Sequence, residues 1–293
     1  NFCDNENNSV LHYAINTSEY MDLFTRLHQF FPKLNPNICN NDGMTPLMNA
    51  IKQNKIDCIL LLQIFDNFTI SGQDLLGFTT LMYFVLYQND NINKLLTLFS
   101  EYIHLFDVNQ TDNDGNTALH HAVKLGYLDT VELLIDTFFN EIDINKPNNN
   151  GITPLMLSLS SENSNPAIFD LLFSLLQQQQ QQLSNISTKL IITAKTSTTI
   201  LPPSTRPFNI NHKDRYGNTL ILASQQANME CIIALQQHYN DVIDCNCFND
   251  HGMNAILYII DNNASIILPI FKQFKTFDVN FAGADSITPL LYA

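Results

Sequence analysis

The apolar residues of this chain fall into pairs of short helical patterns. Leu119, Ala122 and Val123 lie at positions i, i+3 and i+4, so they share one face of a predicted helix. A second run with the same spacing follows, and it consists of Val131, Leu134, Ile135 and Phe138. We therefore expect two short amphipathic helices in succession, each with one buried face.

This unit recurs along the chain. Its clearest copy reads Asp-Gly-Asn-Thr-Ala-Leu-His-His-Ala over residues 114–122, and the apolar residue two positions after the Thr serves as a marker for each copy. The markers are Leu11, Leu47, Leu81, Leu119, Leu155, Ile221, Ile256 and Leu290. Their spacing is nearly constant, except that the interval between Leu155 and Ile221 is almost doubled. The sequence thus contains eight copies of one unit, with one long interval.

The sequence predicts a tight turn in front of the first helix of each unit. A triplet such as Asp107-Val108-Asn109 begins at the same distance before the marker in seven copies, so this segment has a fixed length. Glycine stands four residues before the marker in six copies, and Asn or Asp stands three residues before that glycine. Glycine tolerates a positive φ, and the short Asn or Asp side chain bonds nearby backbone amides. The expected turn glycines are Gly43, Gly77, Gly115, Gly151, Gly217 and Gly252.

The period and the motif resemble those of ankyrin repeats, whose units of about 33 residues carry a T-P-L-H-x-A core. The resemblance implies an all-α repeat solenoid of stacked helix pairs with short β-turn fingers. We expect repeats one to five in residues 1–176 and repeats six to eight in residues 208–293, in one continuous solenoid. Repeat one begins inside a finger and repeat eight stops inside its first helix at Ala293, so we expect a longer protein.

Two positions of the repeat indicate how neighbouring units pack. Where two helices approach closely, the residues are Ala14, Ala50, Phe84, Ala122, Ser158, Ser224, Ile259 and Ala293. The large residues predict that repeats three and seven are splayed or repacked there. His12 and His120 hold the histidine position of the motif, which in ankyrin repeats resembles a structural bridge between units. Met or Leu fills this position in the other repeats, which indicates that it serves packing.

The long interval between Leu155 and Ile221 has two interpretations. A hidden repeat would have Leu190 as its marker, but Ile186 stands in place of the turn glycine and three prolines follow by residue 207. The missing turn and helix signals favour an insertion over residues 177–207. It opens with a run of six glutamines and continues rich in Ser and Thr, which is typical of disorder. The solenoid can close beneath it.

Charge and composition exclude several classes of partner. The chain of 293 residues has 28 acidic and 14 basic residues, a net charge of −14, and no Lys/Arg-rich run. Nucleic-acid binding requires neutralisation of phosphates, so we expect no nucleic-acid partner. No apolar stretch long enough to cross a bilayer occurs, so we expect no membrane insertion of this segment. The six cysteines show no paired framework, which favours free thiols and a cytoplasmic or nuclear location.

One group of residues has the chemistry of a metal site, and it consists of His238, Cys245, Cys247 and His251. Two sulfurs and two imidazoles can hold a tetrahedral zinc ion, but the Cys-x-Cys spacing is not the usual one. The repeat explains Cys245 as a buried apolar position and His251 as a variable fingertip, so we favour ordinary packing. No phosphate loop, Gly-x-Ser-x-Gly or His-Glu-x-x-His motif occurs. We therefore assign no catalytic, cofactor-binding or metal-binding residue.

In the ankyrin family, partners meet the fingertips and the exposed face of the first helix, so these positions are the candidate contacts. Repeat three stands out because Leu75, Leu76 and Phe78 crowd one finger, and Leu86 and Tyr87 extend the apolar stripe. Exposed apolar clusters often mark an interface. The alternative is that these side chains fold back onto a neighbouring finger. The other candidate contacts are Met44, Arg215 and Tyr216.

Protein recognition through the fingertips and the concave inner-helix face is the function that these features favour. The runner-up is a targeting arm of an enzyme, such as a kinase, a ubiquitin ligase or a palmitoyltransferase, whose catalytic domain lies outside this segment. A third class is a metal-dependent activity at the cysteines near residue 245. The expected partners are proteins, and the identity of the partner does not follow from the sequence.

Overall fold

A computed structural model describes residues 3–17, 20–87, 100–160, 165–178, 209–223, 229–261, 268–278 and 280–281. Over these residues the secondary structure is helical, with two isolated β-bridges and no β-strand, so the predicted all-α class is confirmed. Most of the predicted insertion at residues 177–207, together with the marker of repeat eight, Leu290, lies outside the described residues.

Contacts along the chain divide it into two compact units. Unit 1 consists of residues 1–122 and 133–138, and unit 2 consists of residues 123–132 and 139–293. Two helices of the fourth repeat, α7 (Ala118–Lys124) and α8 (Leu128–Thr137), contribute residues to both units. One continuous solenoid stays a prediction.

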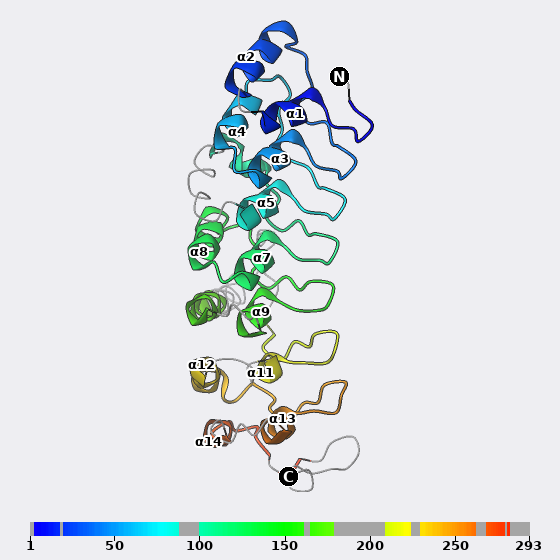
Figure 1. Ribbon diagram of the computed structural model, residues 1–293. Coiled ribbons are helices and arrows are strands. Elements are labelled where there is room, and N and C mark those ends of the chain that lie inside the picture. Colours follow the sequence, from blue (N-terminus) through cyan, green and yellow to red (C-terminus); the bar gives the residue numbers. More distant parts are fainter. Residues whose placement is uncertain are drawn as a thin grey trace, which may run out of the picture. The chain divides into compact units, whose positions relative to one another are not determined.

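Unit 1 has two layers of short helices (Figure 1). The inner layer holds α1 (Val10–Asn16), α3 (Pro46–Lys52) and α5 (Thr80–Tyr87), and the outer layer holds α2 (Tyr20–Phe30) and α4 (Ile56–Leu62). The chain alternates between the layers, and neighbours within a layer touch: α1 contacts α3, α3 contacts α5, and α2 contacts α4. A 3-10 helix, η2 (Ser100–Leu105), is the next described element after α5.

Unit 2 repeats this arrangement. Its inner helices are α9 (Pro154–Ser160), α11 (Leu220–Ala223) and α13 (Ala255–Asp261), and α11 contacts both of the others. Its outer helices are residues 166–178, α12 (Met229–Tyr239) and α14 (Leu268–Phe271), with α12 in contact with α14. Each helix pair follows one of the predicted repeats.

The predicted helix faces are buried. Leu119 and Ala122 on the first helix of repeat four, and Val131 and Leu134 on the second, have no exposed surface. Phe138 lies one residue beyond α8 and is also buried. Because a fully buried aliphatic or aromatic side chain contributes about 1.5–3 kcal/mol, these faces hold the two layers together.

Phe84 shows how repeat three accommodates a large side chain where alanine stands in other repeats. Its ring is fully buried and packs edge-on against Phe106, with 6.2 Å between the ring centroids. Phe106 packs edge-on against Phe138 in turn, at 6.4 Å. Edge-to-face aromatic pairs at such distances are favourable, so repeat three is repacked at this position.

Each of repeats one to seven begins with a hairpin loop, which we call a finger. In the six fingers that carry the predicted glycine, its φ lies between 71° and 82°, in the left-handed region. In each of them the preceding Asn or Asp accepts two backbone N–H bonds; Asn40 Oδ1, for example, accepts from Asp42 and Met44, both at 3.0 Å. Both predictions about the turn are confirmed. In the first finger Asn7, with a φ of 59°, takes the place of the glycine.

His12 is a structural bridge between the first two repeats. Its Nδ1 accepts the Ser9 backbone N–H at 3.1 Å, so Nε2 carries the proton and donates to the carbonyl of Met44 at 3.0 Å. Burial lowers the pKa of His12, which keeps the ring neutral. The expectation that this histidine is structural is confirmed.

Candidate functional site

Backbone hydrogen bonds join the fingertips of unit 1 in order. The three bonds are Asn41 N–H to Glu6 O (2.8 Å), Leu75 N–H to Asp42 O (2.9 Å) and Asn113 N–H to Leu76 O (3.0 Å). The turn glycines permit this approach, since a Cβ on Gly77 would lie 2.8 Å from the backbone nitrogen of the next finger. The fingertips therefore form one ordered row on the inner-layer side of unit 1 (Figure 1).

The row presents a charged and an apolar surface, which we call the finger edge of unit 1. It consists of Glu6, Asp42, Leu75, Leu76 and Asp114, all of them exposed. Leu75 and Leu76 are 69% and 63% exposed, so the apolar tip of repeat three does not fold back onto a neighbouring finger. Large apolar side chains this exposed, two in succession, are typical of a contact surface rather than of the core.

Phe78 differs from the expectation that it lies on the exposed tip. It is half-buried, and its ring lies 5.2 Å from the His121 ring and 6.3 Å from the Tyr83 ring. The residue after the turn glycine returns toward the inner helices, which is the reason that the ring finds cover there. Phe78 therefore belongs to the support of the finger and is not fully presented to a partner.

Met44, at the same position of repeat two, is a clearer correction. It is 7% exposed, so the expectation that this side chain lies open at a fingertip is wrong. Its backbone is held from both sides, because its N–H donates to Asn40 Oδ1 and its carbonyl accepts from His12. The residue sits where two repeats meet.

The helical end of the predicted stripe is partly accessible. Tyr87 is 45% exposed and stacks on Tyr83 with 5.6 Å between ring centroids, whereas Leu86 is half-buried. Tyr83 itself is buried and donates its hydroxyl hydrogen to Asp74 Oδ2 at 2.8 Å. Burial, and then this hydrogen bond, raise the pKa of Tyr83, so it stays a donor.

This hydroxyl bond is one case of a brace that the sequence analysis missed. A side chain on the inner helix reaches the finger carboxylate nine residues earlier in three repeats, as Tyr13 to Asp4 (2.6 Å), Tyr83 to Asp74 (2.8 Å) and His121 to Asp112 (2.8 Å). In the sequence, these three braces are visible as a Tyr or His nine residues after the Asp of the finger. The braces fix the fingers of unit 1 against their helices.

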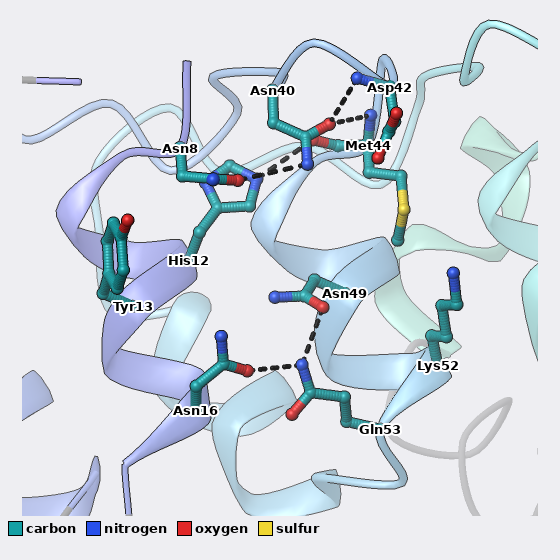
Figure 2. A pocket seen from close by; sticks show the side chains of 10 residues that line it. All are labelled: Asn8, His12, Tyr13, Asn16, Asn40, Asp42, Met44, Asn49, Lys52 and Gln53. Atoms are coloured by element: carbon teal, nitrogen blue, oxygen red, sulfur yellow. Dashed lines mark hydrogen bonds between the residues drawn. The ribbon is translucent and has the colours of Figure 1, made fainter. Parts of the chain in front are cut away.

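A polar pocket of about 440 Å³ opens beside the first two fingers (Figure 2). Half of its ten lining residues are Asn or Gln. Gln53 Nε2 donates to Asn16 Oδ1 and, at 2.8 Å, to Asn49 Oδ1, which links the ends of α1 and α3. Side-chain amides both donate and accept hydrogen bonds, so this wall suits the polar groups of a polypeptide. The charged lining residues are Asp42 and Lys52.

In unit 2 the predicted contacts Arg215 and Tyr216 are exposed but engage one another. The Arg215 guanidinium lies over the Tyr216 ring at 4.7 Å, and its Nη1 donates to Asn150 Oδ1 at 2.7 Å. The Arg215 backbone N–H also donates to the carbonyl of Asn150, at 2.7 Å. Fingers five and six thus stack directly, although the long interval of the sequence separates them.

The alternative zinc site is not assembled. Cys245 is fully buried, and burial raises the pKa of its thiol to about 12, which opposes the thiolate that zinc requires. His238 lies against the Phe173 ring, at 5.7 Å. Over the described ranges no three His, Cys, Asp or Glu side chains are grouped as metal ligands. Cys245 packs as the repeat frame predicts.

None of the described helices has the length and apolar character needed to cross a membrane. For the whole segment, the absence of membrane insertion stays a prediction from the sequence.

Comparisons with known proteins agree with this architecture. A family model for ankyrin repeats (3 copies) matches residues 11–101 and 81–183, which together span residues 11–183 of the 293. No curated protein matches. Among 394 matching chains of solved structures is the ankyrin repeat domain of Bcl-3, titled a unique member of the IkappaB protein family. It has a TM-score of 0.57 and 19% identity, over 86% of this chain and 93% of that chain, which shows the fold. The chain belongs to the ankyrin repeat family, a protein-interaction fold and not a catalytic one.

Proposed function

We propose that this chain recognises a protein partner through the finger edge of unit 1 and the adjoining inner-helix face, with Leu75 and Leu76 as the anchor. The exposure of these two leucines is the observation that carries the proposal. A few well-packed residues near the centre of an interface supply most of the binding energy, and burial of two exposed leucines by a partner would add apolar area to such a centre. Tyr87 and Leu86 extend the contact onto α5.

The construction of the finger supports this role. The Leu75 N–H is bonded to the preceding finger, and Asp74 Oδ1 accepts the N–H groups of Leu76 and Phe78, at 2.9 and 2.7 Å. The backbone beneath the leucines is therefore fixed before a partner arrives. A fixed anchor loses less conformational entropy on binding, so the exposed surface is preorganised.

The role of a targeting arm in a larger enzyme is compatible with the same surface. It concerns residues outside this chain, so the sequence of the whole protein would decide it. No residue described here favours one kind of enzyme over another.

The experiment compares two double variants by quantitative affinity capture from a native extract. Leu75→Asn with Leu76→Asn copies the Asn149-Asn150 tip of repeat five, which the finger frame accepts. Phe30→Asn with Phe31→Asn is the control, because these rings are 68% and 59% exposed at the end of α2, in the outer layer. We expect the tip variant alone to lose the partner that the wild type captures.

Thermal melts of the purified variants accompany the capture, and the captured partner is then purified and its binding measured directly. We expect the free energy of unfolding of the tip variant to lie within about 0.5 kcal/mol of the wild-type value, as is usual for surface substitutions. A folded tip variant that keeps the partner would contradict the proposal, and so would a control variant that loses it equally.

A further inference from the structure

The anchor leucines of the finger edge stand between carboxylates. Asp42, Leu76 and Asp114 hold the same place in successive fingers, directly before the turn glycine. The backbone bonds from Leu75 to Asp42 and from Asn113 to Leu76 fix the order of these three fingers. Along the finger edge, the apolar tip therefore has one acidic finger on each side.

These carboxylates are exposed and uncompensated. Within the described part of the chain, neither Asp42 nor Asp114 has a side-chain hydrogen bond or an ion pair, and both are exposed. The carboxylate of Glu6, one finger further, accepts one side-chain hydrogen bond among the described residues, from Asn8 Nδ2 at 3.2 Å. The turns do not need these carboxylates, because Asn40 and Asp112 make the turn bonds. The carboxylates remain available to a ligand.

We infer that the partner segment carries an apolar centre for Leu75 and Leu76 with Lys or Arg on both sides of it. This inference rests on the proposed recognition surface and names the chemistry of its ligand. Basic side chains on each flank would pair with Asp42 and Asp114 while the apolar centre covers the leucines. An Arg can bind a carboxylate through two parallel hydrogen bonds.

Charge complementarity selects this ligand over others. The chain carries a net charge of −14, which attracts a basic segment and repels acidic peptides, nucleic acids and anionic lipid surfaces. One lysine, Lys52 on α3, lines the pocket with Asp42, and its ammonium points toward the side of the pocket where Met44 and Asp42 lie (Figure 2). Among the described residues, Lys52 and Asp42 form no ion pair, and the Asp42 carboxylate stays exposed at its fingertip.

The test uses synthetic peptides and the purified chain. The probe has a Leu-Leu centre and two arginines at each end; one comparison peptide has glutamates at the ends and another has a Ser-Ser centre. We expect the first peptide alone to bind, with an affinity that weakens as salt rises, because exposed charges are screened. Equal or stronger binding of the glutamate-ended peptide, or no binding of the first peptide, would overturn the inference.

Two matched variants locate the charges. Asp42→Asn with Asp114→Asn copies Asn150 at the same finger position, and Asp66→Asn with Asp136→Asn removes the same charge from exposed positions after α4 and on α8. We expect the finger variant to bind the probe about 3- to 30-fold more weakly, since each exposed ion pair contributes modestly. The outer variant should change the affinity less than twofold, roughly the effect of long-range attraction after screening.

The leucine variant, Leu75→Asn with Leu76→Asn, separates this inference from the proposed function. If it abolishes probe binding while the Asp42 and Asp114 change has no effect, the docking surface stands and its preference for basic flanks is wrong. If none of the finger variants changes binding, the probe binds elsewhere and the inference about basic flanks is wrong, whereas the capture experiment still decides the proposed function. A thermal melt of each variant confirms that the fold is kept.

Discussion

The fingers of unit 1 and unit 2 have the same backbone conformation, but the side chains at their tips differ. In unit 1, Leu75 and Leu76 are exposed, and the acidic tips beside them have no partner among the described residues. In unit 2, the Arg215 guanidinium lies over the Tyr216 ring and donates a hydrogen bond to Asn150, so the side chains at the tips of fingers five and six contact one another. The leucine tip of unit 1 has no such cover, whereas the arginine of finger six covers one face of a ring that is still 43% exposed.

The residues that build a finger are mostly not the residues that it presents to solvent. In both units the frame consists of the turn glycine, the Asn or Asp before it and one backbone bond to the neighbouring finger. The two tip residues contribute backbone atoms to that frame, and some tips add a side-chain bond to the neighbouring finger, as Asn113 Nδ2 does to the Leu75 carbonyl at 2.8 Å. The side chains of Leu75 and Leu76 make no such bond, so they are able to vary with little cost to the fold, which suits a contact surface.

The frame itself should fail equally in both units, and this is the largest effect that we expect. Gly77 and Gly217 both have a positive φ, which L side chains rarely adopt. A Cβ added to Gly77 or Gly217 would also lie only 2.8 or 2.9 Å from the nearest atom of the next finger. Strain of this kind costs about 1–3 kcal/mol before the contact with the neighbouring finger is added. We expect Gly77→Val and Gly217→Val each to lower the free energy of unfolding by about 3 kcal/mol or more.

Denaturant melts of the two valine variants measure this effect, and Asn7→Gly is the control. Asn7 already has a positive φ of 59°, and glycine adopts that conformation without strain, so the control should stay close to the wild type. A Gly217→Val variant as stable as the wild type would mean that unit 2 does not share the frame of unit 1.

Within repeat three, an inward and an outward residue of one finger should differ in effect. Phe78 is half-buried against the His121 and Tyr83 rings, whereas Leu76 is 63% exposed. We expect Phe78→Ala to destabilise the chain by about 1–3 kcal/mol, because it removes buried aromatic area. Leu76→Ala should change stability by less than about 0.5 kcal/mol. Urea titrations of both would decide, and equal losses would place Leu76 in the core.

The sequence predicted the frame because its parts are local. The triplet, the Asn or Asp and the turn glycine all lie within one short segment before the marker, as between Asp107 and Leu119, and each has one conformational use. The frame also predicted that Cys245 is buried, because the equivalent residues are apolar. The left-handed turn of repeat one was missed because Asn7 replaces glycine, and Asn adopts that conformation less often.

The surface was harder to predict because it depends on contacts between repeats. Phe78 finds its cover on His121 of the next repeat, and Met44 is enclosed where His12 of the previous repeat reaches its carbonyl. Neither contact leaves a local signal. The amide wall of the pocket likewise needs Asn16 from one repeat and Gln53 from the next. Leu75 and Leu76 were identified because an apolar pair among polar tips is visible in one finger alone.

His12 should make the stability of unit 1 fall more in acid than it would with the Met or Leu that holds the same repeat position in unit 2. Burial lowers the pKa of His12, whereas the unfolded chain titrates near the usual value of about 6.5. Between those two pKa values the unfolded state binds a proton that the folded state does not, so stability falls as the pH falls below about 6.5. Each unit of difference in pKa is worth about 1.4 kcal/mol.

His12→Met copies Met48, which fills the same slot of repeat two, and Met156, Leu222 and Leu257 fill it in unit 2. We expect the variant to lose less stability than the wild type between pH 7.5 and pH 5.5, roughly the window around the unfolded pKa. The midpoint of urea unfolding, measured at both pH values, gives the difference. An identical loss in both proteins would show that His12 binds protons alike in the folded and the unfolded state, so that burial does not shift its pKa.

Unit 2 should tolerate removal of residues 178–206 with little change in stability. Arg215 N–H donates to the Asn150 carbonyl at 2.7 Å, and His212 Nε2 donates to the Gly151 carbonyl at 2.9 Å, so repeats five and six are already joined at their fingers. Closure entropy depends weakly on length, and each halving of a loop changes it by only about 0.6 kcal/mol. We expect the helical circular dichroism and the cooperative melt to survive, with a stability change of less than about 1 kcal/mol.

A second variant shows whether direct stacking is the reason for that tolerance. Gly151→Val would place a Cβ 3.0 Å from the Asp214 backbone at a φ of 76°, so it should destabilise unit 2 both in the full chain and in the deletion variant. Loss of the cooperative melt on deletion would mean that residues 178–206 contribute to the fold. A harmless Gly151→Val would mean that the two fingers do not pack as described, whatever the deletion does.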